Sequence, residues 1–361
     1  MINFLQGDVF DNIKKLDDNT IDCVVTSPPY WGLRDYGTAS YEGGDPDCKH
    51  TITDGIVDNK NNKLIERPDR ASDKKNCVRC GAKRIDKQLG LEPTYQEHIQ
   101  NIVELFRAMK PKLKDSATVW LNYGDSYAMS SMRGGNKKFS NNVGSHKHYE
   151  KSIKNIKKSI PLGLKPKDLV MIPNRIAIAL QDDGWWIRSE IIWHKPNPMP
   201  ESIKDRPTSC HEKIWLITKS KKYYYDADAI REPVAQGTIT RLSEKNLKNQ
   251  KGSTRGNGGM KSNGNMKPVG NMETKNKRNV WTVTTKPCKE AHFATFPKDL
   301  IEPCIKAGCP ENGIVFDPFG GSGTTGIVAK SLNRKAILSE LNPEYIEIAK
   351  VRINKEFGMF E

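Results

Sequence analysis

The feature that most constrains the fold is an apolar run that ends at two consecutive prolines. Residues Ile21–Val25 (I-D-C-V-V) lead directly into Thr26–Trp31 (T-S-P-P-Y-W). A short apolar run rich in β-branched side chains is typical of a buried parallel strand. Proline lacks an N–H group and fixes φ, so it cannot continue the pairing of a strand. The pattern therefore predicts a buried strand whose carboxyl end is a rigid corner.

This corner offers hydrogen-bond acceptors that suit an amine. Because Pro28 and Pro29 supply no competing N–H, the hydroxyl of Ser27 and the carbonyl of Pro28 can both accept from one exocyclic NH2 group. Tyr30 can then lie against the ring that carries the amine. Such an arrangement suits a nucleobase. For an isolated S-P-P-Y stretch, a plain turn with a packed tyrosine is the alternative.

A glycine-rich turn near the other end of the chain predicts a ligand-binding loop. Residues Phe316–Gly326 read F-D-P-F-G-G-S-G-T-T-G, and no P-loop lysine follows. Glycines permit close approach of the backbone to a ligand, although a turn of this kind suits phosphates equally well. Glu340, at the end of the next predicted strand, is placed to bind ribose hydroxyls. A nucleoside cofactor is therefore favoured.

Together, the two motifs resemble those of the β-class site-specific DNA amino-methyltransferases of restriction–modification systems and phages, in which S/D-P-P-Y precedes F-x-G-x-G. The resemblance covers roughly residues 1–230 and 280–357. It implies an α/β fold of the Rossmann-like, S-adenosylmethionine-dependent type with circularly permuted motif order. Such a fold has a mixed, mostly parallel sheet, helices on both faces, and insertions.

The resemblance also implies a reaction and its residues. A base is flipped out of duplex DNA, and its exocyclic amine receives the methyl group of S-adenosylmethionine by direct in-line transfer. The catalytic residues would be Ser27, Pro28, Pro29 and Tyr30. Family members with Ser at the first motif position usually methylate N4 of cytosine, and those with Asp usually methylate N6 of adenine. We therefore predict N4 of cytosine, with N6 of adenine as the alternative.

Cofactor-binding residues follow from the same resemblance. Asp8 would accept from the adenine amine of the cofactor, although an acid after a strand can equally cap a helix. Phe296 and Pro297 belong to a segment that leads into the cofactor pocket. The remaining predicted contacts are Asp317, Phe319, Gly320, Gly321, Gly323, Thr324 and Glu340.

Trp193 lies in a segment, W-H-K-P-N, that resembles the one beside the flipped base. It is the predicted stacking residue, although clustered Trp and Tyr side chains usually pack in the core. A different class of function is a non-catalytic, zinc-stabilised DNA-binding protein on the same scaffold. The intact catalytic and cofactor motifs argue against that class.

Residues 40–92 form a glycine- and aspartate-rich insertion with the spacing of a zinc knuckle. Cys77 and Cys80 stand in C-V-R-C-G, while Cys48 and His50 stand in C-K-H. The C-x-x-C-G spacing lets two thiolates converge on one metal ion, and Cys48 with His50 would supply the other pair. We predict a closed structural zinc site, with unligated thiols as the alternative.

The net charge of +15 is concentrated in two segments. Residues 132–167 carry ten Lys/Arg against one acidic residue, and residues 241–278 carry ten against two. Positive charge confined to Gly-, Asn- and Ser-rich stretches indicates loops that bind a polyanion, with solvated tails as the alternative. Double-stranded DNA is therefore the predicted partner.

The chain is thus predicted to contain a catalytic domain over residues 1–230 and 281–361, a basic loop over 130–167 and a target-recognition region over 231–280. No apolar run has membrane-spanning length and no charged-then-apolar leader follows Met1, so a cytoplasmic location without a membrane partner is expected. A cognate restriction endonuclease is a partner that the resemblance allows and the sequence does not decide.

Overall fold

The structure is a computed structural model that describes most of the chain. The described residues are 1–32, 38–48, 56–58, 63–65, 76–77, 79–86, 88–128, 163–237, 239, 273–286 and 296–358. Most of the predicted basic loop and of the predicted target-recognition region lie outside them, as does His50.

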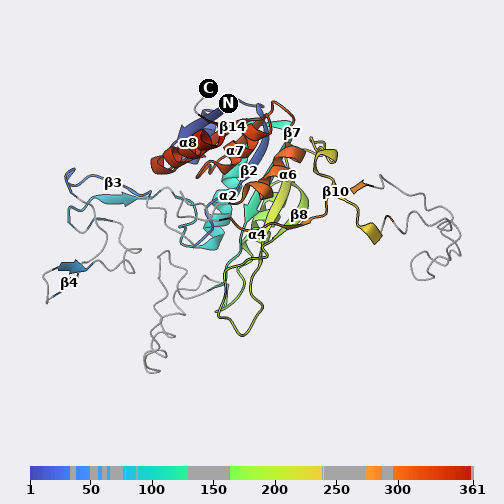
Figure 1. The fold of residues 1–361 in the computed structure, drawn as a ribbon. Coiled ribbons are helices and arrows are strands. Elements are labelled where there is room, and N and C mark those ends of the chain that lie inside the picture. Colours follow the sequence, from blue (N-terminus) through green and yellow to red (C-terminus); the bar gives the residue numbers. More distant parts are fainter. Residues whose placement is uncertain are drawn as a thin grey trace.

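An eight-stranded sheet forms the centre of the molecule (Figure 1). Neighbouring strands are parallel, except that β9 runs antiparallel to both β7 and β8. The prediction of a mixed, mostly parallel sheet is therefore confirmed. The spatial order is β1 (Ile2–Gln6), β14 (Lys335–Glu340), β13 (Ile314–Asp317), β2 (Ile21–Thr26), β7 (Leu113–Tyr123), β9 (His211–Thr218), β8 (Trp186–His194) and β12 (Val280–Thr282).

Strand β2 is the apolar run before the two prolines, and all of its residues are buried. It lies between β13 and β7, so both of its edges and both of its faces are covered. Val24 packs into one apolar cluster, while Cys23 and Val25 pack into another on the opposite face of the sheet. This alternation is what a strand buried on both sides requires.

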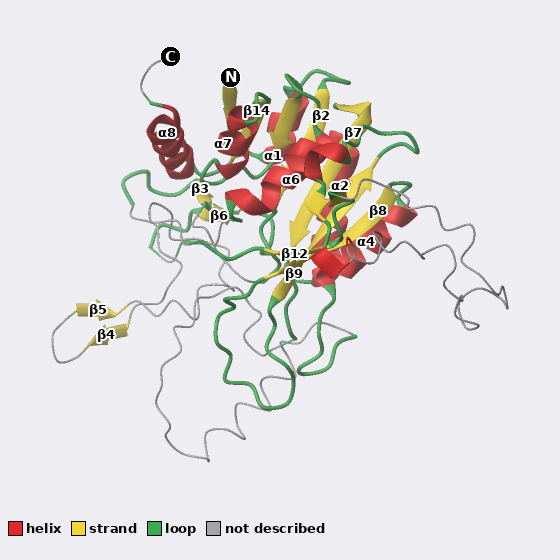
Figure 2. Ribbon diagram, turned by 45° about the vertical axis from the view of Figure 1, so that its right-hand side comes forward, coloured by secondary structure: helices red, strands yellow, loops and turns green. Residues whose placement is uncertain are grey.

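Helices cover both faces of the sheet (Figure 2). The helices α1 (Val9–Lys14), α2 (Tyr95–Met109) and α4 (Ile172–Asp182) contribute to the first cluster. The helices α6 (Lys298–Gly308) and α7 (Thr324–Ser331) contribute to the second, and α8 (Pro343–Phe357) packs beside α7, β1 and β14.

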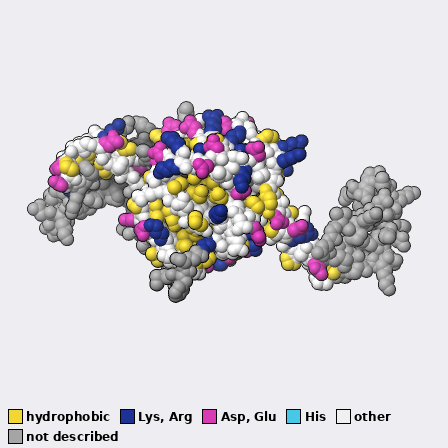
Figure 3. Space-filling view, turned by 90° about the horizontal axis from the view of Figure 1, so that it is seen from above, with side chains coloured by type: hydrophobic (Ala, Val, Ile, Leu, Met, Phe, Trp, Pro, Cys, Tyr) yellow, Lys and Arg dark blue, Asp and Glu magenta, His cyan; other side chains and the backbone are white. Residues whose placement is uncertain are grey.

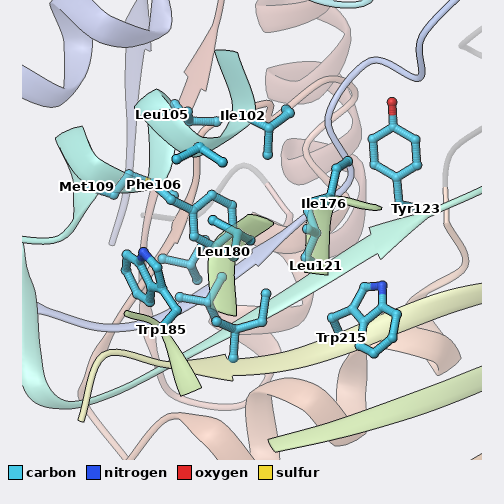
Figure 4. Packing of buried hydrophobic residues seen from close by; sticks show 14 of the residues in the cluster. Ile102, Leu105, Phe106, Met109, Leu121, Tyr123, Ile176, Leu180, Trp185 and Trp215 are labelled. Atoms are coloured by element: carbon cyan, nitrogen blue, oxygen red, sulfur yellow. The ribbon is translucent and has the colours of Figure 1, made fainter. Parts of the chain in front are cut away.

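Helix α2 illustrates how local sequence determines an element. Thr94 caps it, with Oγ1 accepting from the N–H of Glu97 at 3.2 Å, as the T-x-x-E spacing predicts. Its apolar residues recur with helical periodicity and face the core, where Ile102 and Phe106 share the first apolar cluster with Leu180 of α4 (Figure 4).

Short strand pairs lie outside the main sheet. The pair β3 (Ser40–Glu42) with β6 (Lys83–Ile85) and the pair β4 (Ile56–Asp58) with β5 (Lys63–Ile65) belong to the predicted insertion over 40–92. A third pair, β10 (Glu232–Pro233) with β11 (Thr274–Lys275), follows the 3-10 helix η2 (Asp228–Ile230). Within the described part of the chain, none of the helices has the length and apolarity to span a membrane.

Candidate active site

The predicted site residues meet at one edge of the sheet because they follow the carboxyl ends of parallel strands. Asp8 follows β1, Glu340 ends β14, Asp317 ends β13 and Ser27 follows β2. Strands β2 and β13 are direct neighbours, so two motifs about 290 positions apart in the chain come together. In open α/β sheets, ligands bind in the crevice beyond this edge.

Asp317 joins the two motifs. Its Oδ1 accepts from the hydroxyl of Thr26 at 2.8 Å and from the N–H of Phe319 at 3.1 Å, while Oδ2 accepts from the hydroxyl of Thr325 at 2.6 Å. The carboxyl is fully buried, and burial raises its pKa from 3.8 to about 6, although these three donors favour the ionised form.

Glu340 holds the glycine-rich turn. Its two carboxylate oxygens accept from the N–H groups of Gly321 and Asn342, each at 2.9 Å. Burial raises the pKa of Glu340. The acid and the turn that were both predicted to bind the cofactor are therefore bonded directly to each other.

The glycines of this turn serve different purposes. A Cβ at Gly320 would lie 2.8 Å from Cβ of Leu338, and one at Gly323, where φ is +79°, would lie 2.8 Å from Cβ of Ala349. These two glycines therefore allow the turn to pack against β14 and α8. At Gly321, the nearest atom to an added Cβ is 3.8 Å away. Close approach of a ligand is consequently best supported at Gly321.

The other predicted cofactor contacts also have partners within the protein. Asp8 caps α1, with Oδ1 accepting from the N–H groups of Phe10 and Asp11 at 2.9 and 3.3 Å, as the alternative interpretation expects. Thr324 is buried and accepts from Arg352 of α8 at 3.2 Å. Phe296 and Pro297 lie at the start of α6, where Phe296 packs against the second apolar cluster.

The S-P-P-Y corner is held by a network that the sequence does not reveal. Ser27 Oγ donates to Tyr30 Oη at 3.2 Å, and Tyr30 Oη donates to Glu212 Oε2 at 2.8 Å. Asn122 Nδ2 donates to the same carboxylate oxygen at 3.2 Å. Burial and the charge of Glu212 raise the pKa of Tyr30 well above its usual value, so the phenol keeps its proton.

Tyr123 of β7 supports the corner from behind. Its ring stacks on that of Tyr30 with centroids 4.5 Å apart, and its hydroxyl accepts from the N–H of Trp31 at 2.9 Å. The same hydroxyl lies 2.6 Å from Nε2 of His98, and Nδ1 of His98 lies 2.8 Å from Glu92. Burial opposes the charge of Glu92, but the hydrogen bonds it receives prevail and lower its pKa.

Residues 21–351 match the family model described as "DNA methylase". The chain belongs to this family. It is 38% identical over 347 residues to the type II methyltransferase M.SmaI of Serratia marcescens, which covers 96% of this chain and 89% of the relative. It is 37% identical over 351 residues to M.Cfr9I of Citrobacter freundii, with 97% and 87% covered. The predicted class, a DNA amino-methyltransferase of restriction–modification type, is therefore confirmed.

Solved structures support the fold of this methyltransferase. The PvuII DNA methyltransferase (cytosine-N4-specific) superposes with a TM-score of 0.53 at 16% identity, covering 97% of this chain and 86% of its own. The protein TTHA0409 of Thermus thermophilus, solved with S-adenosyl-L-methionine, superposes with a TM-score of 0.52 at 16% identity, covering 100% and 98%. At this identity the likeness demonstrates the fold alone.

Trp193 of the methyltransferase does not occupy the place predicted for it. Its side chain is only 3% exposed and packs in the second apolar cluster. Its indole N–H donates to the carbonyl of Val283 at 2.8 Å, and Nζ of Lys195 lies 4.3 Å from the ring centroid. A ring covered in this way cannot stack on an incoming base, so the stacking prediction is wrong and the core-packing alternative holds.

The insertion brings three of the four predicted metal ligands together. The Sγ atoms of Cys48, Cys77 and Cys80 all lie within 4.8 Å of one another, and those of Cys48 and Cys77 are 3.9 Å apart. A tetrahedral zinc ion with Zn–S bonds of about 2.3 Å needs sulfurs roughly 3.8 Å apart. A backbone hydrogen bond at Ala82 lowers the pKa of Cys80, whereas burial raises the pKa of Cys48 to about 11, so the distances between the sulfurs carry the argument. The cluster therefore fits the predicted metal.

Among the residues that hold the S-P-P-Y corner, the sequence did not reveal the roles of Asn122, Tyr123, Glu212 and Lys195, whose ammonium group forms an ion pair with Glu212. Asn122 could have been anticipated, because it lies near the carboxyl end of a predicted strand. No pattern in the sequence pointed to Glu212. It stands near the start of β9, and only the antiparallel direction of that strand brings it to the edge where the parallel strands end.

The buried carboxyl of Asp317 predicts a pH dependence of stability. Its pKa is higher in the folded protein than in the unfolded chain, so the folded state binds the proton more tightly. Its contribution to stability is therefore complete below about pH 4 and is lost as the pH rises through about 6, a change of about 3 kcal/mol. Relative to the Asp317→Asn variant, the wild type should lose this free energy of unfolding between about pH 4 and 7.

Urea unfolding of both proteins at several pH values measures the difference. Because Asn has a similar shape and does not titrate, the comparison cancels the pH dependence of groups that the two proteins share. A difference that stays constant over this pH range would contradict the assignment.

Proposed function

We propose that this methyltransferase methylates N4 of cytosine in duplex DNA, using S-adenosylmethionine. The observation that carries the proposal is the position of Ser27. It directly follows β2, which pairs with β13, the strand that leads into the glycine-rich turn. The proposed amine acceptor and the turn proposed to bind the nucleoside of the cofactor therefore lie at the ends of adjacent strands.

The acceptor set explains how a poor nucleophile could react. The amine of cytosine is weakly nucleophilic because its lone pair is delocalised into the ring. If Ser27 Oγ and the Pro28 carbonyl accept its two hydrogens, the nitrogen becomes pyramidal and its lone pair is exposed for in-line attack. N6 of adenine requires the same acceptors and is the alternative target.

S-adenosylmethionine, when bound, supplies an electrophilic methyl group on a sulfonium sulfur. The residues proposed to hold it are those of the turn, above all Gly321 with its room for close approach, and Glu340 for the ribose. Asp317 holds the turn in place through Phe319. The roles of Asp8, Phe296, Pro297, Gly320, Gly323 and Thr324 as cofactor contacts are part of the same proposal.

Charge supports an approach of DNA from the edge that carries the site. Strands β7 and β8 both end at this edge, and the basic segment 132–167 follows β7 in the sequence. The molecule viewed from the opposite side carries interspersed acidic and basic side chains (Figure 3). Because a polyanion favours surfaces of one sign, the strand-end side is the better candidate.

The product of the reaction tests the target base. The protein is incubated with labelled S-adenosylmethionine and mixed-sequence duplex DNA, and the digested nucleosides are identified by mass. N4-methylcytosine is the expected product. Detection of N6-methyladenine instead would show that adenine is the target base and would leave the enzyme class unchanged.

The Ser27→Ala variant tests the role of the corner. Removal of one acceptor that acts mainly in the transition state should lower turnover by about 10²- to 10³-fold. The dissociation constant for DNA should change by less than about threefold, since phosphate contacts dominate affinity. Ser331→Ala, which removes a hydroxyl that donates to the carbonyl of Val328 in the preceding turn of α7, is the control. Equal losses of turnover and DNA affinity in Ser27→Ala would favour a binding role instead.

We further propose that the cysteine cluster holds one structural zinc ion, with His50 as the fourth ligand. Three thiolates at the spacing of a tetrahedral site support this, and the insertion has only short strand pairs among its described residues to stabilise it. A metal would therefore supply much of its folding free energy.

Metal analysis of the purified protein should find about one zinc per chain. The double variant Cys77→Ser/Cys80→Ser should lose both the metal and several degrees of melting temperature, while Cys210→Ser, at a cysteine outside the cluster, should retain both. A wild-type protein without zinc, or a double variant with unchanged metal content, would refute the site.

A further inference from the structure

Glu212 reaches the catalytic corner from a strand that carries none of the recognised motifs. Its carboxylate has three partners: the hydroxyl of Tyr30 at 2.8 Å, the amide of Asn122 at 3.2 Å and the ammonium group of Lys195. The side chains of Glu212 and Lys195 are 17% and 19% exposed. At this burial, solvent screens the attraction between the two charged groups only partly.

The directions of these hydrogen bonds follow from chemistry. An ionised carboxylate can only accept, and it lies 2.8 Å from Tyr30 Oη whereas Oδ1 of Asn122 lies 3.3 Å away, so Tyr30 donates its single proton to Glu212. The oxygen of Tyr30 is then left to accept, and Ser27 Oγ donates to it at 3.2 Å. The proton of Ser27 consequently points to Tyr30, and the lone pairs of Ser27 remain for another donor.

The tyrosine cannot easily leave this position. Its ring stacks on Tyr123, and on another side it passes so close to Gly124 that a Cβ there would lie 2.7 Å from Cε2 of Tyr30. The same Cβ would lie 3.3 Å from the carboxyl carbon of Glu212. Gly124 therefore allows the tyrosine and the glutamate to approach each other.

We propose that Glu212 is a positioning residue that orients Ser27 through Tyr30 and finally receives the proton that methyl transfer releases. This inference rests on the proposed function and assigns it a proton path, Ser27 to Tyr30 to Glu212.

Atoms and electrons balance in this transfer. The lone pair of the amine nitrogen forms the N–C bond, and the S–CH3 bond breaks with its electron pair remaining on sulfur, which becomes a neutral thioether. The nitrogen gains a positive charge and loses one proton to Ser27 Oγ. Ser27 passes its own proton to Tyr30, and Tyr30 passes its own to Glu212, which becomes a neutral carboxylic acid.

The charge of the partners does not prevent this transfer. The methylated amine is a strong acid, because a nitrogen whose lone pair is delocalised into a ring is a weak base. It can therefore protonate a carboxylate even beside Lys195. Burial keeps Tyr30 a phenol between turnovers, so the path starts with every proton in place.

A purely structural role for Glu212 is the competing explanation, since its ion pair also ties the loop after β8 to β9. A structural role predicts loss of stability and weaker binding together. A positioning role predicts a loss of rate with binding preserved. Because the hydroxyl of Tyr30 and the carboxylate of Glu212 act through one hydrogen bond, their substitutions should also lower the methylation rate non-additively.

The test uses Tyr30→Phe, Glu212→Gln and the double variant, with single-turnover methylation of duplex DNA. Each single variant should lower the rate about 10²-fold, the lower end of the range for positioned proton transfer. The double variant should be no slower than the slower single variant. Dissociation constants for S-adenosylmethionine and DNA should stay within about threefold. Glu190→Gln on β8, which removes the carboxylate of a similar ion pair with Lys213 of β9, is the control and should retain its rate.

The outcomes separate this inference from the proposed function. If the wild type is active and the variants methylate DNA within about threefold of its rate, the proton path is overturned and the proposed function remains intact. Losses that multiply in the double variant also overturn it. A wild type that methylates no base overturns the proposed function itself. If Glu212→Gln does not fold, the single-turnover rate of Tyr30→Phe tests the proton path alone, because this variant removes the hydroxyl and keeps the stacked ring.

Discussion

The arrangement of the active site depends on the hydrogen bonds that the buried carboxylate of Asp317 accepts. It accepts from Thr26, which directly precedes Ser27, and from Phe319, which opens the glycine-rich turn. Leaving a buried charge without its donors costs several kcal/mol, so a shift of β2 against β13 would be strongly opposed. The corner proposed to bind the amine and the turn proposed to bind the cofactor are therefore fixed to each other at one carboxylate.

The direction of each strand decides which residues reach this edge. Parallel strands deliver the residues that follow them, which is why Asp8, Ser27, Asp317 and Glu340 converge. The antiparallel β9 delivers a residue from its beginning, Glu212, to the same edge. A sheet that was parallel throughout would place that carboxylate at the far end of the strand, away from Tyr30.

Local sequence predicts the parts of the molecule that local physics determines. The apolar run before two prolines became β2, and Thr94 with a helical apolar period became α2. The C-x-x-C-G pattern likewise brought Cys77 and Cys80 together, because its geometry is set within a few residues. The convergence of the catalytic and cofactor motifs came from their joint resemblance to a family rather than from either motif alone.

Sequence predicted poorly where distant segments decide the environment of a side chain. The W-H-K-P-N stretch suggested a stacking role for Trp193, but the ring packs in the second apolar cluster and its indole N–H bonds to Val283, 90 positions later and just after the adjacent strand β12. Glu212 is the reverse case. It is an ordinary polar residue in its own segment, and it acquires its chemistry only from Tyr30, Asn122 and Lys195.

The S-P-P-Y corner explains why such distant support is necessary. Two prolines free the nearby acceptors by removing N–H donors, and for the same reason they leave the hydroxyl of Ser27 without a backbone N–H partner in the next two residues. Its orientation must then come from Tyr30, and that of Tyr30 from Tyr123 and Glu212. The property that suits the motif to its proposed role as an amine acceptor thus makes it dependent on side chains far along the chain. The catalytic unit is consequently larger than the motif by which it is recognised.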